Sequence, residues 1–408
     1  MTVRVAPIER MRGFIAGYDR RLWVLFLVQM LVSIGFGAAM PFVSLYLHRE
    51  LGVSMTVVGI IMLAAALISA LGRIIGGEIA DRFGRKPLIC FTMAARTVIF
   101  LLMAYVIHIR AGYLLVGLVF LAIRFAGALT QPAISAMVAD VVAPERRIEA
   151  FGLLRIGLNA GWAIGPALGG FLVTISYSSV FLLTTVVSLI GLIVIIRFTT
   201  ESLRVANQHR FKIKQLFSVG KNRIFLVFCF FSFLLFLVMG QLASTLAVFA
   251  AEIVGLSKLE LGFLYTLNGL VVVLLQWPAA RLSSRLGRRR ALVIGSLLYA
   301  IGYFSVGFVP SFVYLLGSMV IITLGEVIFS PTATATVAAM AADEQIGRYM
   351  GFFGISEAFG WSAGLFIGGL LFDAFAMTPL ILWGTIAGIG LVAAIGFAVS
   401  GRYYERSG

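Results

Sequence analysis

The chain has 408 residues, of which 61% are hydrophobic and 12% are charged, and its mean hydropathy is +1.05. Soluble globular domains are closer to half apolar, with about a quarter of their residues charged. This composition therefore excludes a soluble globular domain. The formal net charge is +15, and whether it indicates nucleic-acid binding or membrane topology depends on where the basic residues lie.

Apolar segments of about twenty residues recur along the whole chain, and each is long enough to cross a hydrocarbon core of about 30 Å as a helix. The first follows a basic stretch without a small-residue cleavage site, so we predict a retained span and not a signal peptide. The sequence therefore predicts an all-α membrane protein with twelve transmembrane helices. The predicted spans are 22–47, 53–79, 88–108, 112–139, 149–174, 179–197, 222–250, 259–281, 291–309, 312–340, 349–373 and 378–400.

Lys and Arg are distributed unequally between the segments that join these spans. Most lie on the side of the N-terminus, and only Arg49, Arg110 and Lys258 lie on the other side. This asymmetry follows the positive-inside rule and predicts a multi-pass protein of the cell (inner or plasma) membrane with both termini cytoplasmic. The basic excess therefore indicates topology and contact with anionic membrane lipid, and it does not indicate nucleic-acid binding.

A short charged segment, GGEIADRFGRKPLI (76–89), joins the second and third spans. Gly84 can supply the positive φ that a tight reversal needs. The segment resembles the signature loop of the major facilitator superfamily, roughly G-x-x-x-D-R-x-G-R-K. The resemblance extends from about Leu22 to about Ser400, and it implies two pseudo-symmetric six-helix bundles, a cavity between them and alternating access.

In the family that this loop resembles, the loop aspartate is a gate element. If the loop of this chain has the same role, Asp81 is expected near the cytoplasmic N-terminus of the eleventh span, around Tyr349 to Gly351. The helix dipole there favours an anion by roughly 0.3–1 kcal/mol. Asp140, at the end of span four, is a candidate partner for Arg85. The alternative is that these charges only set topology. The candidate gating residues are Gly77, Asp81, Arg82, Gly84, Arg85, Lys86 and Asp140.

The fifth span contains RIGLNAGWAIGPALGG (155–170), in which glycines recur every four residues. This spacing places them on one helix face, where they permit close packing in lipid, and Pro166 predicts a bend. The segment resembles the G-x-x-x-G-P-x-x-G-G signature of the drug:proton antiporter branch, in which a bent fifth helix seals against the other half. Generic helix packing is the alternative. The motif residues are Gly157, Asn159, Gly161, Gly165, Pro166, Gly169 and Gly170.

A polar linker divides the chain into two halves that resemble each other. Pro132 aligns with Pro331, and the same offset pairs Gly169 and Gly170 with Gly368 and Gly369. A duplication of six spans explains this alignment, and repeated halves are typical of transporters with a site near the bilayer midplane. The predicted parts are an N-terminal tail (1–21), an N-terminal bundle (22–200), a linker (201–221), a C-terminal bundle (222–400) and a C-terminal tail (401–408).

Ionisable side chains inside spans indicate function, because each costs about 2.5–3.5 kcal/mol at a helix centre on insertion scales. Arg73, Arg96 and Arg155 lie about two turns from their cytoplasmic ends, where long side chains can snorkel. Arg124 and Glu326 lie near the middle of spans four and ten, at matching depths in the two halves. Glu326 is the candidate proton-coupling acid, because an apolar cavity favours the neutral form of a carboxylic acid.

Resemblance supports the same assignments. LGEVIFSP (324–331) resembles the tenth span of some multidrug antiporters with an acid at this position. Arg124, also a candidate for proton coupling, matches the fourth-span arginine of that branch, although the usual R-x-x-Q-G pattern is incomplete here. Glu357, in span eleven, is a second candidate for proton coupling or a structural partner. The alternative for Glu326 is a structural contact with Arg124 or with another polar group.

These features predict a secondary-active transporter that exports hydrophobic, cationic compounds in exchange for protons. The alternative is a proton-coupled symporter or facilitator of a small metabolite, such as a sugar or an organic acid. No enzymatic motif, cofactor motif or metal-ligand cluster is visible, so we expect no enzyme, cofactor or metal site, and the family resemblance implies a monomer. Candidate substrate-cavity residues are Phe36, Phe42, Phe236, Met239, Gln241, Asn268, Gln276 and Phe329.

Overall fold

The structure, a computed structural model, describes residues 17–143, 146–203, 222–308, 311–341 and 346–405, and these residues form helices and no strands. The helices of the first half are α2 (Arg20–Leu45), η1 (Tyr46–Glu50), α3 (Met55–Phe83), α4 (Arg85–His108), α5 (Tyr113–Val141), α6 (Arg147–Ile175) and α7 (Tyr177–Phe198). Those of the second half are α9 (Arg223–Gly240), η4 (Gln241–Ala243), α10 (Thr245–Glu252), α11 (Lys258–Leu286), α12 (Arg288–Val306), α13 (Phe312–Met340), α14 (Ile346–Phe375) and α15 (Pro379–Glu405).

Local sequence signals set the helix ends. Ser54 caps α3, and Ser257 with Glu260 forms a capping box at the start of α11. Gly84 has φ +103° between α3 and α4, and Gly287 has φ +81° at the equivalent reversal between α11 and α12. The positive φ predicted for Gly84 is confirmed, and both copies of the loop use glycine for the same backbone conformation.

Eleven segments of the described residues are long and apolar enough to cross a membrane, and they correspond to eleven of the twelve predicted spans. The predicted ninth span corresponds to α12, which is present as a helix but is not among these eleven segments. It is 19 residues long and begins with Arg288, Arg289 and Arg290, so its apolar part is short. α12 nevertheless packs against α13 and α15 as the sixth member of its bundle.

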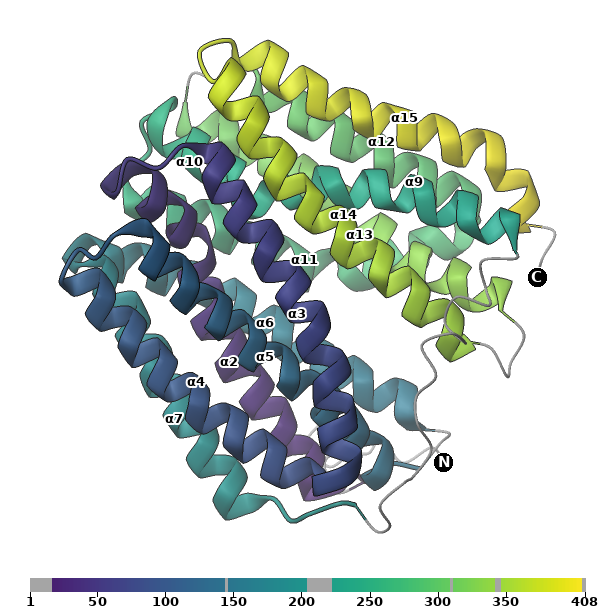
Figure 1. The fold of residues 1–408 in the computed structure, drawn as a ribbon. Coiled ribbons are helices and arrows are strands. Elements are labelled where there is room, and N and C mark those ends of the chain that lie inside the picture. The colour runs from purple at the N-terminus through teal and green to yellow at the C-terminus, as the bar shows by residue number, and fades with distance from the viewer. Residues whose placement is uncertain (1–16, 144–145, 204–221, 309–310, 342–345, 406–408) are drawn as a thin grey trace, which may run out of the picture.

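The chain forms two six-helix bundles with the same internal packing (Figure 1). In the N-terminal bundle α2 packs against α6 and α7, α3 against α5, and α4 against α5 and α7. In the C-terminal bundle α9 packs against α14 and α15, α11 against α13, and α12 against α13 and α15. Numbered as spans, these are the same five pairs, so the duplication seen in the sequence is also present in the packing.

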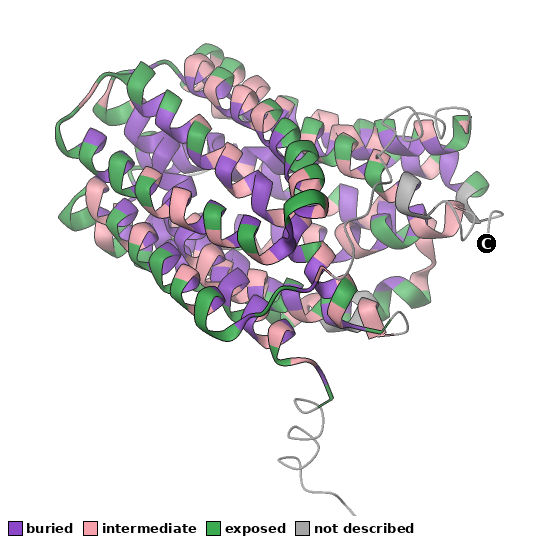
Figure 2. Cartoon of the chain, turned by 60° about the horizontal axis from the view of Figure 1, so that its bottom comes forward, coloured by how far each residue is buried: buried purple, intermediate pink, exposed green. Residues whose placement is uncertain are grey.

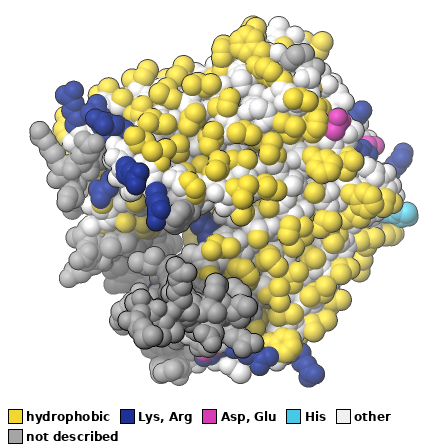
Figure 3. Space-filling model, turned by 180° about the vertical axis from the view of Figure 1, so that it is seen from behind, with side chains coloured by type: hydrophobic (Ala, Val, Ile, Leu, Met, Phe, Trp, Pro, Cys, Tyr) yellow, Lys and Arg dark blue, Asp and Glu magenta, His cyan; other side chains and the backbone are white. Residues whose placement is uncertain are grey.

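Buried residues gather inside the bundles, while the outer faces are exposed (Figure 2). Hydrophobic side chains cover most of the face shown in Figure 3, and Lys and Arg gather mainly toward one end. A wide apolar surface bordered by charge is what a lipid-facing protein presents. The start of α2 and the end of α15 lie at one end of the molecule (Figure 1), which we call the terminal end, and we call the opposite end the far end.

The two bundles meet through α6 with α11 and through α3 with α14. In sequence these are spans five with eight and spans two with eleven, which the duplication relates to each other. The contacts lie toward the far end: a Cβ on Gly170 would lie 2.7 Å from the carbonyl oxygen of Lys258, the first residue of α11. Gly369 of α14 has the equivalent contact with the carbonyl of Met55, the first residue of α3.

The glycine stripe of α6 packs inside its own bundle. A Cβ on Gly161 would lie 2.5 Å from Cβ of Ser33, and one on Gly165 would lie 2.6 Å from the carbonyl oxygen of Ile34, both on α2. Gly157 and Gly169 also face α2. The expected contact of the fifth helix with the other half is present at Pro166 and Gly170, whereas the glycines four residues apart share one helix face that contacts α2. The contact with α11 uses the neighbouring face, at Ala163, Pro166 and Gly170.

Candidate functional site

Glu326 lies near the middle of α13 and is half-buried. The Nδ2 group of Asn268, on α11, donates a hydrogen bond to Oε2 of Glu326 at 3.2 Å and another to Oγ1 of Thr323 at 2.9 Å. The Thr323 hydroxyl donates to the carbonyl oxygen of Met319 at 2.7 Å, so it can only accept from Asn268. This chain of hydrogen bonds fixes the amide so that one N–H group points at the carboxyl group.

Arg155 of α6, in the other bundle, is the cation whose charge acts on the Glu326 carboxylate. Within the described residues Glu326 has no ion pair within 4 Å, and no contact joins it to Arg124. Of the structural alternatives considered for Glu326, the structure therefore shows the polar contact with Asn268 and not the pair with Arg124. A carboxyl group with one neutral donor and a distant cation can exchange a proton without breaking a salt bridge.

Glu357 lies on α14 and is exposed, yet its charge interacts with Arg73 of α3 and Arg155 of α6. Both arginines belong to the N-terminal bundle and are also exposed. Glu357 therefore faces the other bundle and not lipid. It lies nine residues, or about 13 Å along the helix, on the terminal side of Phe366, where α14 packs closely against Gly59 of α3.

Two more arginines lie inside the N-terminal bundle. The Arg124 guanidinium lies 5.2 Å from the centre of the Phe36 ring, a cation–π contact with α2. Arg96 is 5% exposed, lies against Phe100 and Gly127, and its Nε has no hydrogen-bond partner among the described residues. The snorkelling expected for Arg96 is therefore wrong, because its side chain points into the bundle and not along the helix to the interface.

The far end is held shut by contacts between the bundles. Asp373, near the end of α14, accepts hydrogen bonds from the backbone N–H groups of Met55 (2.9 Å) and Thr56 (2.7 Å), at the start of α3. His48 Nε2 lies 3.1 Å from Oε2 of Glu252, which adds a second polar contact. In the described parts of the chain these are the hydrogen bonds between the bundles, and none joins them at the terminal end. The structure is thus closed at the far end.

Comparison with known proteins agrees with this architecture. The family model described as Major Facilitator Superfamily matches residues 25–251 and 228–406, which together cover almost the whole chain. The chain belongs to the major facilitator superfamily. The expected family is thereby confirmed, whereas the drug:proton antiporter branch stays a prediction.

Relatives within the superfamily are distant. The chain is 28% identical over 392 residues to multidrug resistance protein MdtH of Citrobacter koseri, covering 94% of this chain and 95% of that protein. It is 27% identical over 347 residues to the uncharacterized MFS-type transporter YttB of Bacillus subtilis, covering 84% and 86%. Among solved structures, a peptide transporter POT in complex with sulfate has a TM-score of 0.76 at 18% identity over 95% of each chain. The nucleoside transporter NupG has a TM-score of 0.75 at 17% identity over 94% of this chain and 99% of that one. These two share the fold.

The superfamily signature loop is folded around Arg85 at the terminal end. Its guanidinium contacts Asp81 at 3.0 Å and Asp140 at 3.2 Å, so the suggested partner of Asp140 is correct. Asp81 is exposed to solvent on one side and, among the described residues, forms no hydrogen bond with 349–351. Its contact with α14 stays a prediction for a state in which the terminal end is closed.

Glu201, which the sequence reading overlooked, completes this loop. Its carboxylate accepts hydrogen bonds from the backbone N–H groups of Arg85 (3.1 Å) and Lys86 (3.0 Å), at the start of α4. Burial raises the pKa of Glu201, but these bonds and those from Ser202 and Leu203 outweigh it, so the pKa lies below its ordinary value. The signal was present in the sequence, since acids are favoured at helix N-termini, but Glu201 is distant from α4 along the chain.

The Glu201 contact predicts a pH-dependent stability. Because the folded-state pKa is lowered, its contribution is present above the unfolded-state pKa and is lost as the pH falls through the folded-state value. We expect Glu201→Gln to lower the free energy of unfolding at neutral pH by about 1.5 kcal/mol or more, since charged acceptors are lost. Thermal unfolding of the purified protein measures this. A difference from wild type that did not shrink below about pH 4 would contradict the assignment.

Most of the expected cavity residues lie in the bundle cores instead. Phe236 and Phe329 contact each other inside the C-terminal bundle, with ring centres 5.9 Å apart. Gln241 bridges the break between α9 and α10 by donating to the carbonyl oxygens of Leu237 (3.0 Å) and Gly364 (2.8 Å). Phe42 and Met239 are buried as well. These residues are corrected to packing roles in this structure, whereas Phe36, Asn268 and Gln276 remain cavity candidates.

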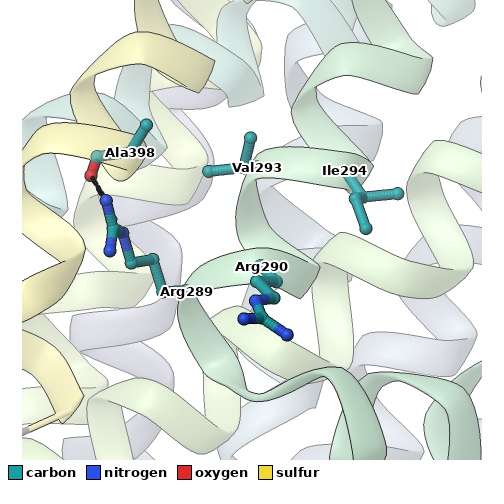
Figure 4. Close-up of a pocket in the computed structure, with 5 residues that line it drawn as sticks. All are labelled: Arg289, Arg290, Val293, Ile294 and Ala398. Carbon is teal, nitrogen blue, oxygen red and sulfur yellow. Dashed lines mark hydrogen bonds between the residues drawn. The ribbon is translucent and has the colours of Figure 1, made fainter.

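A separate cavity of about 440 Å³ lies between α12 and α15 (Figure 4). It is lined by Arg289, Arg290, Val293, Ile294 and Ala398, and Arg289 donates to the carbonyl oxygen of Ala398. These helices do not form the main contacts between the bundles, so this cavity is distinct from the Glu326 site. Its two arginines on an apolar wall suit the anionic lipid contact expected from the sequence.

Proposed function

We propose that the protein is a secondary-active exporter that exchanges protons for hydrophobic compounds by alternating access. The observation that supports this most strongly is Glu326, a carboxyl group held by a neutral amide near the middle of its span and facing the opposite bundle. The MdtH relatives are named as multidrug resistance proteins, and the fifth-helix motif is similar to that of drug:proton antiporters. With both termini cytoplasmic, the closed far end would be the extracytoplasmic one.

The proposed cycle follows from one carboxyl group that alternates between two partners. Open to the cytoplasm, Glu326 releases its proton, and the anionic carboxylate then favours binding of substrate. Rearrangement of the bundles opens the far end, where proton uptake neutralises Glu326 and weakens its hold on the substrate. Return of the protonated form completes the exchange. A bound proton and a bound substrate thus exclude each other, which is the requirement for antiport.

Reconstitution in vesicles tests the direction of coupling. With an imposed pH gradient, antiport predicts that a lipophilic dye such as rhodamine B moves against the proton flux and accumulates only while the gradient lasts. Collapse of the gradient with a protonophore is the control. Co-movement of a sugar or an organic acid with protons would contradict antiport and would favour the symporter alternative.

A further inference from the structure

The helices that face each other across the two bundles carry opposite charges. Arg73, Arg124 and Arg155 lie on α3, α5 and α6 of the N-terminal bundle, and Arg96 lies behind them on α4. Glu326 and Glu357 lie on α13 and α14 of the C-terminal bundle. The other acids in the described residues lie within about two turns of a helix end. The middle of the molecule therefore holds four positive charges on one side and two negative charges on the other.

These charges are connected electrostatically without being paired. The charge of Arg155 acts on Glu326 and Glu357, that of Arg73 acts on Glu357 and Arg124, and that of Arg124 acts on Arg96. In the part of the chain that the structure describes, none of the six is in an ion pair within 4 Å. The space between the bundles beside Arg155 and the two glutamates is therefore charged, and these charges are not neutralised in ion pairs.

The opening of this space is set by the packing of the bundles. Among the close glycine contacts of α6 with α11, the one nearest the terminal end is that of Ala163 with Gly269. Arg155 lies eight residues further toward the terminal end, about 12 Å along the helix, and it is exposed. Arg155 thus lies beyond the contacts that close the far end, on the side from which a ligand arriving from the terminal end would approach.

The excess of arginines over glutamates affects which ligand charge is favoured. A purely cationic compound would enter a space bordered by the exposed Arg73 and Arg155, with the positive charges of Arg124 and the buried Arg96 inside the adjoining bundle. Proton binding at Glu326 would increase the positive excess over the two glutamates. Arg96 makes this imbalance costly, because a buried guanidinium without an acidic partner is poorly compensated. An anionic group on the ligand removes the excess, and the planar guanidinium binds carboxylates through two parallel hydrogen bonds.

We propose that the substrate is a zwitterionic amphiphile, whose anionic group binds the arginines of the N-terminal bundle and whose cationic group binds Glu326 and Glu357. The half-buried rings of Phe36 and Trp162, 5.8 Å apart and beside Arg124, offer the apolar contact. This inference revises the purely cationic substrate expected from the sequence. It rests on the transport function proposed above, but it does not require proton coupling.

Two dyes that differ in a single group test the proposal. Rhodamine B carries a free carboxylate beside its cationic ring system, and rhodamine B ethyl ester has the same ring system with that carboxylate esterified. Fluorescence anisotropy with the purified full chain in nanodiscs measures the dissociation constant of each dye without a pH gradient. We expect the free acid to bind at least about tenfold more tightly than the ester, the change expected for one charged hydrogen-bonded contact.

Variants locate the anion site. We expect Arg155→Gln and Arg73→Gln to weaken binding of the free acid about tenfold and to leave the ester nearly unchanged. Arg155→Lys keeps the charge but loses the paired hydrogen bonds, so its affinity should lie between those of wild type and Arg155→Gln. Removing a charge from a membrane interior does not threaten folding, and the thermal midpoint verifies this. Arg197→Gln is the matched control, because Arg197 is exposed at the end of α7.

Three results would overturn the proposal: tighter or equal binding of the ester, binding of neither dye, or a free-acid preference that survives both arginine substitutions. Tighter binding of the ester would restore the purely cationic class. Free-acid binding without proton-driven movement of the dye in vesicles would refute the proposed antiport and leave this inference standing. The two failures are therefore distinguishable.

Discussion

Replacing Glu326 with Gln is expected to abolish proton-driven export while leaving downhill movement of the substrate intact. Gln keeps the size of the side chain and an oxygen that can accept the hydrogen bond from Asn268, so the packing between α13 and α11 is retained. What it removes is the only titratable group on α13 that faces Asn268. In vesicles, dye accumulation under an imposed pH gradient should fall to the level of protein-free vesicles.

Two matched substitutions make this result specific. Glu357→Gln tests the second candidate acid, which faces Arg73 and Arg155 but has no amide donor among the described residues. If Glu326 alone couples transport, Glu357→Gln weakens dye binding and keeps the response to the gradient. Glu50→Gln is the control for loss of an exposed carboxylate at the far end. Gradient-driven accumulation by the Glu326→Gln protein would refute the coupling role outright.

The sequence indicated how deep a residue lies along its span, but it did not indicate toward which neighbouring helix its side chain points. The position of Glu326 near the middle of its span follows from counting residues, and the structure confirms a half-buried site there. That Arg155 and not Arg124 is the cation whose charge acts on it depends on which face of α6 turns toward the C-terminal bundle. In water an apolar stripe identifies the buried face, but in lipid every face of such a helix is apolar.

The same limit explains the corrected cavity residues. Phe236 and Phe329 have the composition of a drug-binding wall, yet lipid, bundle core and cavity all accept an aromatic side chain. Glycine was more informative, because a stripe of small residues on a membrane helix permits close backbone approach. The duplicated pairs Gly169–Gly170 and Gly368–Gly369 lie at close helix contacts in both halves, although the sequence does not tell which partner each one meets.

Asp373→Asn is expected to shift the molecule from the state closed at the far end toward the opposite one. The Asp373 carboxylate accepts two backbone N–H groups at the N-terminus of α3, where the helix dipole also favours an anion. A hydrogen bond to a charged group contributes about 1.5–3 kcal/mol, so losing one shifts the equilibrium about tenfold or more. Spin labels at Arg197 and Arg402, exposed on α7 and α15, report it as a larger population of short distances at the terminal end.

The control for this shift is Glu260→Gln, which removes a helix-capping carboxylate at the same end of the molecule but inside one bundle. Its distance distribution should match that of wild type, with Cys90 and Cys229 replaced in every protein compared.

α3 and α14 run antiparallel, so the end of each helix lies beside the start of the other. Each helix has an acid near its end that can cap that start: Asp373 does so here, and Asp81 is predicted to do so in the opposite state. Asp81→Asn should therefore lengthen the distances, and a shift in the same direction as Asp373→Asn would contradict a reciprocal pair of latches.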